Sequence, residues 1–186
     1  QNSNYNVVED TVTIIVGKAA PSYTVPTGLT AVYGKTLADV TLPEGFTWEA
    51  EETTYVGPFG NNTFKVTYDP KDDNYSIVTG IDVTINVTKA SLTITASSHT
   101  ITYGDVEPTF TVSISGLVAG DIESDITVGT ITSTYVQYVS GVASTYAVVA
   151  SDYSNNNYNI TYVNGTITVK QKSLNDATVT LPQTEY

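Results

Sequence analysis

The 186-residue sequence gives little support for catalysis. It has no cysteine and a single histidine, His99, in the stretch Ser97-Ser98-His99-Thr100 between two predicted strands. A hydrolytic triad needs a nucleophile, a base and an orienting carboxylate, and the chain lacks the Gly-x-Ser-x-Gly turn that would present a serine. We therefore expect His99 to be a solvated turn residue and the protein to be neither an enzyme nor dependent on a cofactor.

Two groups of acidic residues offer the oxygen ligands that calcium prefers. One group is Asp69, Asp72 and Asp73, and the other is Asp121, Glu123 and Asp125. Neither has the Asp-x-Asp-x-Asp-Gly spacing of a calcium loop, and Asp in a turn commonly accepts hydrogen bonds from nearby backbone. Turn formation is the expected role. Asp69, Asp72 and Asp73 remain as candidate metal ligands, and no other metal site is predicted.

Tyrosine is abundant, with 14 copies. Its ring can stack on a sugar or anchor a protein interface. Tyr135 and Tyr138 stand in an alternating stretch, 134–138, which predicts that they share one face of a strand. They are therefore the candidate ligand-binding pair, and the alternative is that they fill a core or an interface. Tyr75 and Tyr158 each follow an asparagine, which favours a recurring structural corner whose hydroxyl bonds backbone.

The charge of the chain excludes several classes of partner. The net charge is −12, and all seven cationic residues are lysines. Nucleic-acid binding needs a basic footprint, and the bidentate arginine fork that recognises phosphate is missing. Anionic membrane surfaces are disfavoured for the same reason, and no apolar run approaches the roughly 20 residues of a spanning helix. We expect no nucleic-acid partner and no membrane insertion.

The sequence repeats one structural unit. Tyr33-Gly34 and Tyr103-Gly104 lie 70 residues apart, and Leu37–Pro43 returns in looser form at Leu174–Pro182. Three Asn-Tyr pairs each precede a Thr/Val/Ile alternation and a lysine: Asn4-Tyr5 with Lys18, Asn74-Tyr75 with Lys89, and Asn157-Tyr158 with Lys170. Such repeats are typical of modules in an array. We predict a first module at 20–89 and a second at 90–171, between the end of a preceding module (1–19) and the start of a following one (172–186), with neighbouring repeats as partners.

Hydrophobic alternation with a period of two dominates both modules and predicts half-buried strands. The predicted strands are Thr11–Val16, Phe64–Tyr68, Ile81–Val87, Ser91–Thr95, Phe110–Ile114, Tyr146–Val149 and Gly165–Val169. The only helical suggestion is one turn at Thr36–Val40. The spacing of strands and turns favours an all-β fold of tandem Ig-like β-sandwich modules, with small β-grasp-like modules as the alternative. Gly34, Gly104 and Trp48 are expected to be structural.

The apolar row of Thr11–Val16 has no module of its own in this arrangement. An open strand is a template for pairing with another sheet. We therefore expect Thr11–Val16 to dock along a sheet edge, either of the first module or of a neighbouring molecule. The joints between modules are short, which predicts a semi-rigid array.

The second module carries a recognisable pattern: Ile101-Thr102-Tyr103-Gly104-Asp105, then Ser115-Gly116-Leu117, then Asn164–Val169. It resembles the MBG domain of the Tyr-Gly-X type, found in tandem in large bacterial surface proteins. The first module, with Tyr33-Gly34 and Leu42–Trp48, looks like the bacterial Ig-like repeats of Gram-positive cell-wall adhesins. Both resemblances imply an extracellular location at the bacterial cell surface, and neither names a ligand.

Three functions remain open on this basis. The first is a non-enzymatic stalk repeat of a secreted or cell-wall-anchored adhesin. The others are a carbohydrate- or mucin-binding module, with a host glycan or protein as partner, and an accessory domain of an extracellular glycosidase. An exposed aromatic strip with a concave floor would favour the binding module, whereas burial of the repeated tyrosines would favour the stalk.

Overall fold

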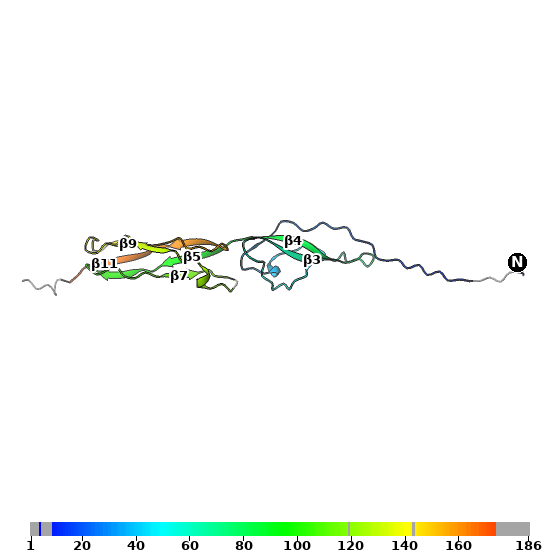
Figure 1. The fold of residues 1–186 in the computed structure, drawn as a ribbon, viewed down its shortest axis with the longest axis horizontal. Helices are drawn as coiled ribbons and strands as arrows, with labels where there is room; N and C mark the ends of the chain where they lie inside the picture. Colours follow the sequence, from blue (N-terminus) through cyan, green and yellow to red (C-terminus); the bar gives the residue numbers. More distant parts are fainter. Residues whose placement is uncertain (1–3, 5–8, 119, 143, 174–186) are drawn as a thin grey trace, which may run out of the picture.

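A computed structural model describes residues 4, 9–118, 120–142 and 144–173, and the fold is all-β, as predicted. Two bodies lie end to end along one axis, and the described N-terminal residues run on from the first as an extended arm (Figure 1). Each body has its own hydrophobic core. The described chain contains no helix long and apolar enough to cross a membrane.

The first module is built on one four-stranded sheet. Its elements are β1 (Leu29–Val32), the 3-10 turn η1 (Leu37–Asp39), β2 (Phe46–Trp48), β3 (Gly60–Tyr68) and β4 (Val78–Thr88). The strand order is β1-β4-β3-β2, with β1 parallel to β4 and the other pairs antiparallel. The expected helical turn is therefore present as η1.

Alternation along β4 explains why this strand lies at the centre of the sheet. Ile81, Val83, Ile85 and Val87 are buried, and the residues between them are exposed. The other side of the core comes from irregular segments, because Leu37 of η1 and Val56 before β3 are fully buried against the sheet. The first module thus closes its core with one sheet and its connecting segments.

The second module is a sandwich of two sheets. Its elements are β5 (Ala90–Ala96), β6 (His99–Thr102), β7 (Val112–Ser115), the 3-10 turn η2 (Glu123–Asp125), β8 (Thr130–Ser133), β9 (Thr145–Ser151), β10 (Tyr158–Val163) and β11 (Gly165–Lys170). One sheet has the order β10-β5-β7 and the other β6-β11-β9-β8. Leu92 and Ile94 of the first sheet pack with Val148 and Ile167 of the second.

The chain changes sheets between β10 and β11. Asn164 is the single residue between them, and the two strands belong to different sheets. A Cβ on Gly165 would lie 2.1 Å from the carbonyl oxygen of Ser97, so a side chain cannot be placed there without moving backbone. Glycine is required at this position because of that close approach.

Thr11–Val16 is not a strand in this structure, and the prediction that it docks on the first module is wrong. Residues 9–18 form no secondary structure, and the side chains of Val12, Ile14, Ile15 and Val16 are almost fully exposed. The described arm bridges the first module at Ala19, which pairs with Tyr75, and residues 11–16 pair with neither edge strand, β1 or β2. Docking on a neighbouring molecule remains a prediction. Tyr5 and the repeat at Leu174–Pro182 lie outside the described residues.

Candidate functional site at the joint between the modules

A single residue links the two modules. β4 ends at Thr88 and β5 begins at Ala90, so only Lys89 stands between two hydrogen-bonded strands. The ammonium group of Lys89 lies 5.1 Å from the centre of the Phe59 ring, at a distance typical of a cation–π contact. The link is therefore as short as one residue, and its side chain packs on a ring of the first module.

A carboxylate of the second module binds a tyrosine of each module. The hydroxyl of Tyr33, after β1, lies 3.1 and 3.0 Å from the two carboxylate oxygens of Asp121. The Tyr158 hydroxyl, at the start of β10, donates to Oδ2 of Asp121 over 2.6 Å. The Tyr33 and Tyr158 rings meet edge to face with centres 5.5 Å apart. Because Tyr33 also packs against both hydrophobic cores, this cluster joins the modules.

A second polar contact crosses the joint nearby. The Phe59 backbone N–H donates to Oδ1 of Asn157 over 3.0 Å. Within the second module, the Val118 backbone N–H donates to the Tyr158 hydroxyl over 3.0 Å, and Tyr158 is only 3% exposed. Tyr158 is thus a buried corner whose hydroxyl serves backbone, as its repeated position suggested.

Burial and Asp121 keep both tyrosines protonated. Removal from water, followed by the hydrogen bond to Asp121, raises the pKa of Tyr158 to about 12. The same two causes, in the same order, raise the pKa of Tyr33 above its ordinary value. A negative phenolate would be poorly solvated and would face a carboxylate. Both hydroxyls therefore remain donors far above neutral pH.

The Tyr-Gly pairs form equivalent turns in the two modules. Tyr33 N–H donates to Thr88 O over 2.8 Å, and Tyr103 N–H donates to Lys170 O over 2.9 Å. Gly34 and Gly104 have φ values of +88° and +90°, a conformation that side chains disfavour. Each turn therefore ties its tyrosine to the end of the module's last strand, which places Tyr33 at the joint.

The Asn-Tyr pairs also repeat in backbone geometry but differ in burial. Asn74 N–H donates to Oδ1 of Asp72 over 2.9 Å, and Asn157 N–H donates to Oδ1 of Asn155 over 2.8 Å. Tyr75 is nevertheless 38% exposed, and its hydroxyl bonds no residue that the structure describes. The buried-corner interpretation therefore fails for Tyr75, because no described residue covers it as Tyr33 covers Tyr158.

Tyr135 and Tyr138 do not form the predicted pair on a strand face. Residues 134–138 lie outside any strand. Tyr135 is buried, and its hydroxyl donates to Asp105 O over 2.7 Å, whereas Tyr138 is 66% exposed and has a φ of +64°. Residues 137–139 form a turn that includes Tyr138, so the alternation in sequence does not place the two rings on one strand face. Trp48 is half-buried against Phe64 in the first module.

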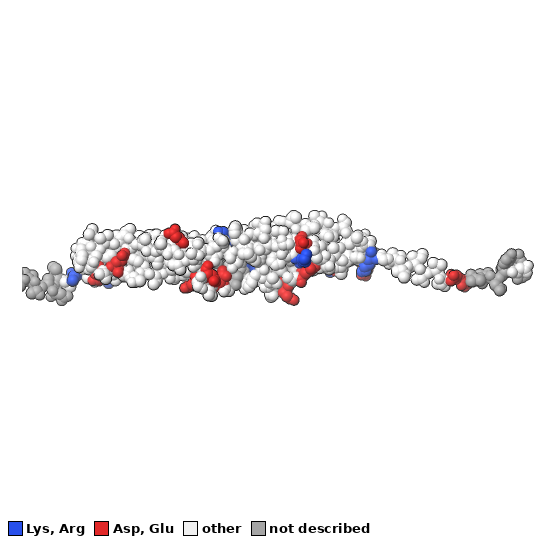
Figure 2. Space-filling model, in the orientation of Figure 1, with Lys and Arg blue, Asp and Glu red and all other residues white. Residues whose placement is uncertain are grey.

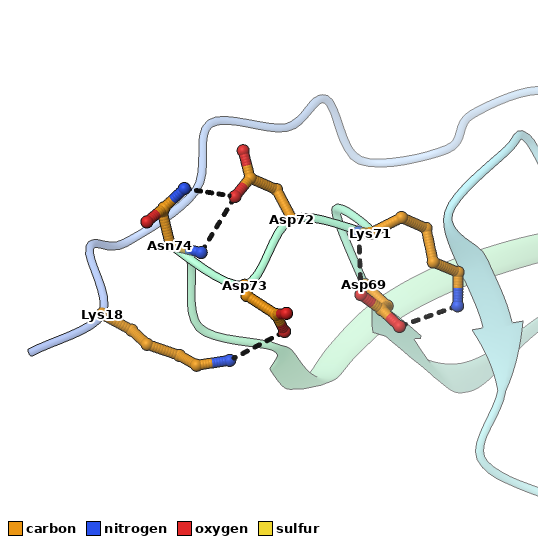
Figure 3. A network of polar contacts seen from close by, with 6 residues as sticks. All are labelled: Lys18, Asp69, Lys71, Asp72, Asp73 and Asn74. Carbon is orange, nitrogen blue, oxygen red and sulfur yellow. Dashed lines mark hydrogen bonds and ion pairs between the residues drawn. The ribbon is translucent and has the colours of Figure 1, made fainter.

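The three acidic candidates for a metal site bind separate partners (Figure 3). Asp69 accepts hydrogen bonds from the Nζ and the backbone N–H of Lys71, over 2.7 and 2.9 Å, and these bonds lower its pKa. Asp72 accepts from Asn74, and Asp73 lies 3.9 Å from Nζ of Lys18. Within the described ranges no three acidic, histidine or cysteine side chains are grouped to hold a metal ion. The side chains of this loop form turns and ion pairs.

His99 opens strand β6 and is half-buried, so the expectation of a solvated turn residue is wrong. Its Nε2 lies 3.0 Å from Ser97 Oγ, and its ring meets Phe110 edge to face. Ser97 Oγ also accepts from the Thr111 backbone N–H, so this contact ties β6 to the segment before β7. The arrangement is structural.

An open groove of about 250 Å³ lies beside the joint. It is lined by Tyr33, Gly34, Tyr55, Gly57, Pro58 and Asn157. Tyr55 is 53% exposed, so about half of this residue is accessible to solvent. On the face shown in Figure 2, acidic side chains and lysines lie in separate small groups rather than in one patch.

Residues 92–168 match the family model of the MBG domain (YGX type). The match runs from β5 into β11 and includes the Tyr103-Gly104 turn, Asp121 and Tyr158. MBG domains are non-catalytic repeats of bacterial surface proteins. The match does not reach the first module, so its likeness to Ig-like repeats is not confirmed. No curated protein and no solved structure matches the chain.

Proposed function

We propose that the chain is a non-enzymatic stalk segment of a secreted or cell-wall-anchored adhesin, exposed on the outer surface of a Gram-positive bacterium. The observation that carries this proposal is the joint, where Lys89 alone links the strands and Tyr33 bonds Asp121 across the modules. A stalk must hold a binding region away from the cell, and a fixed joint keeps its modules extended. The MBG match of the second module supports the same role.

The composition is suited to a spacer outside the cell. A net charge of −12 keeps the chain soluble and limits association with other acidic surfaces. The repeated tyrosine at the joint, Tyr158, is used for packing between modules. Its burial favours the stalk over a binding role for that residue.

The surface location is tested by protease treatment of intact cells of the source organism. Peptides of this chain should be released from intact cells and identified by mass spectrometry, while a cytoplasmic marker protein stays uncut. Release of these peptides only after the cells are lysed would overturn the surface location.

The groove beside the joint favours carbohydrate binding as a second candidate function. The exposed Tyr55 ring offers a face for a sugar, and Asn157 adds an amide at the same groove. Titration of the full chain with neutral oligosaccharides tests this function by calorimetry. Binding that Tyr55→Ala removes and Tyr138→Ala preserves would support it, because Tyr138 is exposed but lies outside the groove. Absence of binding to the full chain would reject it.

A further inference from the structure

The N-terminal arm contains a copy of the central strand of the first module. Thr11–Ala20 aligns with Asp82–Ser91 without gaps, and six of the ten positions are identical: Val12, Thr13, Ile14, Val16, Lys18 and Ala19 match Val83, Thr84, Ile85, Val87, Lys89 and Ala90. The two copies have opposite burial. Val83, Ile85 and Val87 are 2%, 0% and 0% exposed, whereas Val12, Ile14 and Val16 are 82%, 81% and 87% exposed.

The buried copy shows what covers this sequence. β4 lies between β1, which is parallel to it with Leu29 opposite Ile85, and β3, which is antiparallel with Asn62 opposite Ile85. Its apolar side chains point into the core of the first module. The arm carries the same apolar side chains as β4, but it leaves them in water. Exposure of these apolar side chains is unfavourable.

The arm also enters the first module as β4 enters the second. Ala19 N–H donates to Asn74 O over 2.8 Å, and Ala90 N–H donates to Asn157 O over 2.9 Å. Ala19 forms a parallel bridge with Tyr75, and Ala90 pairs in parallel with Tyr158. The backbone of the joint is thus already present around Lys18-Ala19.

A second exposed group lies at the same end of the first module. Tyr75 is 38% exposed, while its counterpart Tyr158 is covered by Tyr33 from the module ahead of it. A module that used the arm as its last strand would end beside Tyr75, where its own Tyr-Gly turn would lie. One additional module could therefore cover both the arm and Tyr75.

We propose that Thr11–Val16 is the central strand of a further module of this repeat, supplied by the same polypeptide. The strand inserts parallel to a strand of the β1 type and antiparallel to one of the β3 type, and the Tyr-Gly turn of that module covers Tyr75. A second copy of the first module does not fit, because its own β4 fills the position between β1 and β3. The proposal extends the array on which the proposed stalk function depends.

Hydrogen exchange on the full chain and on an extended chain tests the inference. In the extended chain a copy of residues 20–73 is joined ahead of Asn4, which places a second set of β1, β2 and β3 before the arm. We expect amides 12–16 to exchange freely in the original chain and to be slowed on the order of 100-fold in the extended one. As a control, a copy of residues 20–89 joined ahead of Ala19 supplies β4 itself. Protection of the added strand in the control but not of amides 12–16 in the extended chain would overturn the proposal.

Two matched variants of the extended chain test the register. Ile14 corresponds to Ile85, which is buried, and Ile15 corresponds to Asn86, which is exposed. We expect Ile14→Asn to abolish the protection of amides 12–16 and Ile15→Asn to preserve it. Equal loss in both variants would overturn the inferred register. If amides 12–16 are protected but no peptides are released from intact cells, the surface location is rejected and this inference stands. If peptides are released but amides 12–16 are not protected, this inference is rejected and the surface location stands.

Discussion

Replacement of Tyr158 by phenylalanine removes one oxygen atom from the joint and leaves the ring in place. The lost hydroxyl accepts a hydrogen bond from Val118 N–H over 3.0 Å and donates to Asp121 over 2.6 Å. Leaving a buried partner unsatisfied costs about 1 to 3 kcal/mol, so Tyr158→Phe should lower the free energy of unfolding of the second module by about that amount. In a domain of this size, each kcal/mol lowers Tm by about 4 to 8 °C.

Tyr75→Phe is the matched control. Tyr75 occupies the equivalent position of the first module, is 38% exposed and bonds no described residue through its hydroxyl, so its loss should change stability by less than about 0.5 kcal/mol. Trp48, the only tryptophan, lies in the first module, so its fluorescence follows that module while circular dichroism follows both. Urea titrations of the three proteins measure the effect. Equal midpoints for Tyr158→Phe and the parent, or equal losses in the two variants, would show that the Tyr158 hydroxyl does not stabilise the second module.

Three further predictions address the joint, the turn and the acidic loop. In an absorbance titration of the phenolates, Tyr158 should ionise near pH 12. Because its pKa is higher in the folded than in the unfolded chain, its contribution to stability should be complete below pH 10 and lost as the pH approaches 12. Ionisation of all 14 tyrosines of the folded chain near pH 10 would contradict this. Gly104→Ala should destabilise the second module by about 1 to 3 kcal/mol, because φ is +90° there and the new Cβ would lie 3.1 Å from the Tyr138 ring. Gly17→Ala is the control and should leave Tm unchanged, because no atom lies within 4 Å of the new Cβ. Melting curves with EDTA and with millimolar calcium should coincide, because Asp69, Asp72 and Asp73 bind separate partners; a rise of many degrees with calcium would show a site.

The regular elements follow from local sequence. The alternation of Ile81, Val83, Ile85 and Val87 predicts β4, and branched residues in period two predict β5 and β11 in the same way. The Tyr-Gly pairs correctly mark equivalent turns, because a positive φ at the second residue favours glycine. These features depend on neighbours in the chain, which is why one sequence suffices to predict them.

The joint depends on contacts between distant residues. Asp121 stands in an acidic group that suggests calcium, and only the fold brings Tyr33, 88 residues away, to its carboxylate. The signal that could have identified it was the repeat itself, since Tyr33-Gly34 must lie at the end of the first module where the second begins. At Thr11–Val16 the local pattern predicts a strand that the structure does not contain. A strand pattern produces a strand only where partner strands exist.

We infer that the Tyr33–Asp121–Tyr158 cluster holds the two modules in one orientation. Backbone amide relaxation by NMR on the full chain tests it most directly, with Asp121→Ala compared with Asp82→Ala, which removes an exposed carboxylate bound to Lys65 far from the joint. We predict that the two modules of the parent chain share one elongated diffusion tensor, and that the same holds for Asp82→Ala. In Asp121→Ala each module should have a diffusion tensor of its own. Independent tumbling of the modules in the parent chain would show that the cluster does not hold them in one orientation.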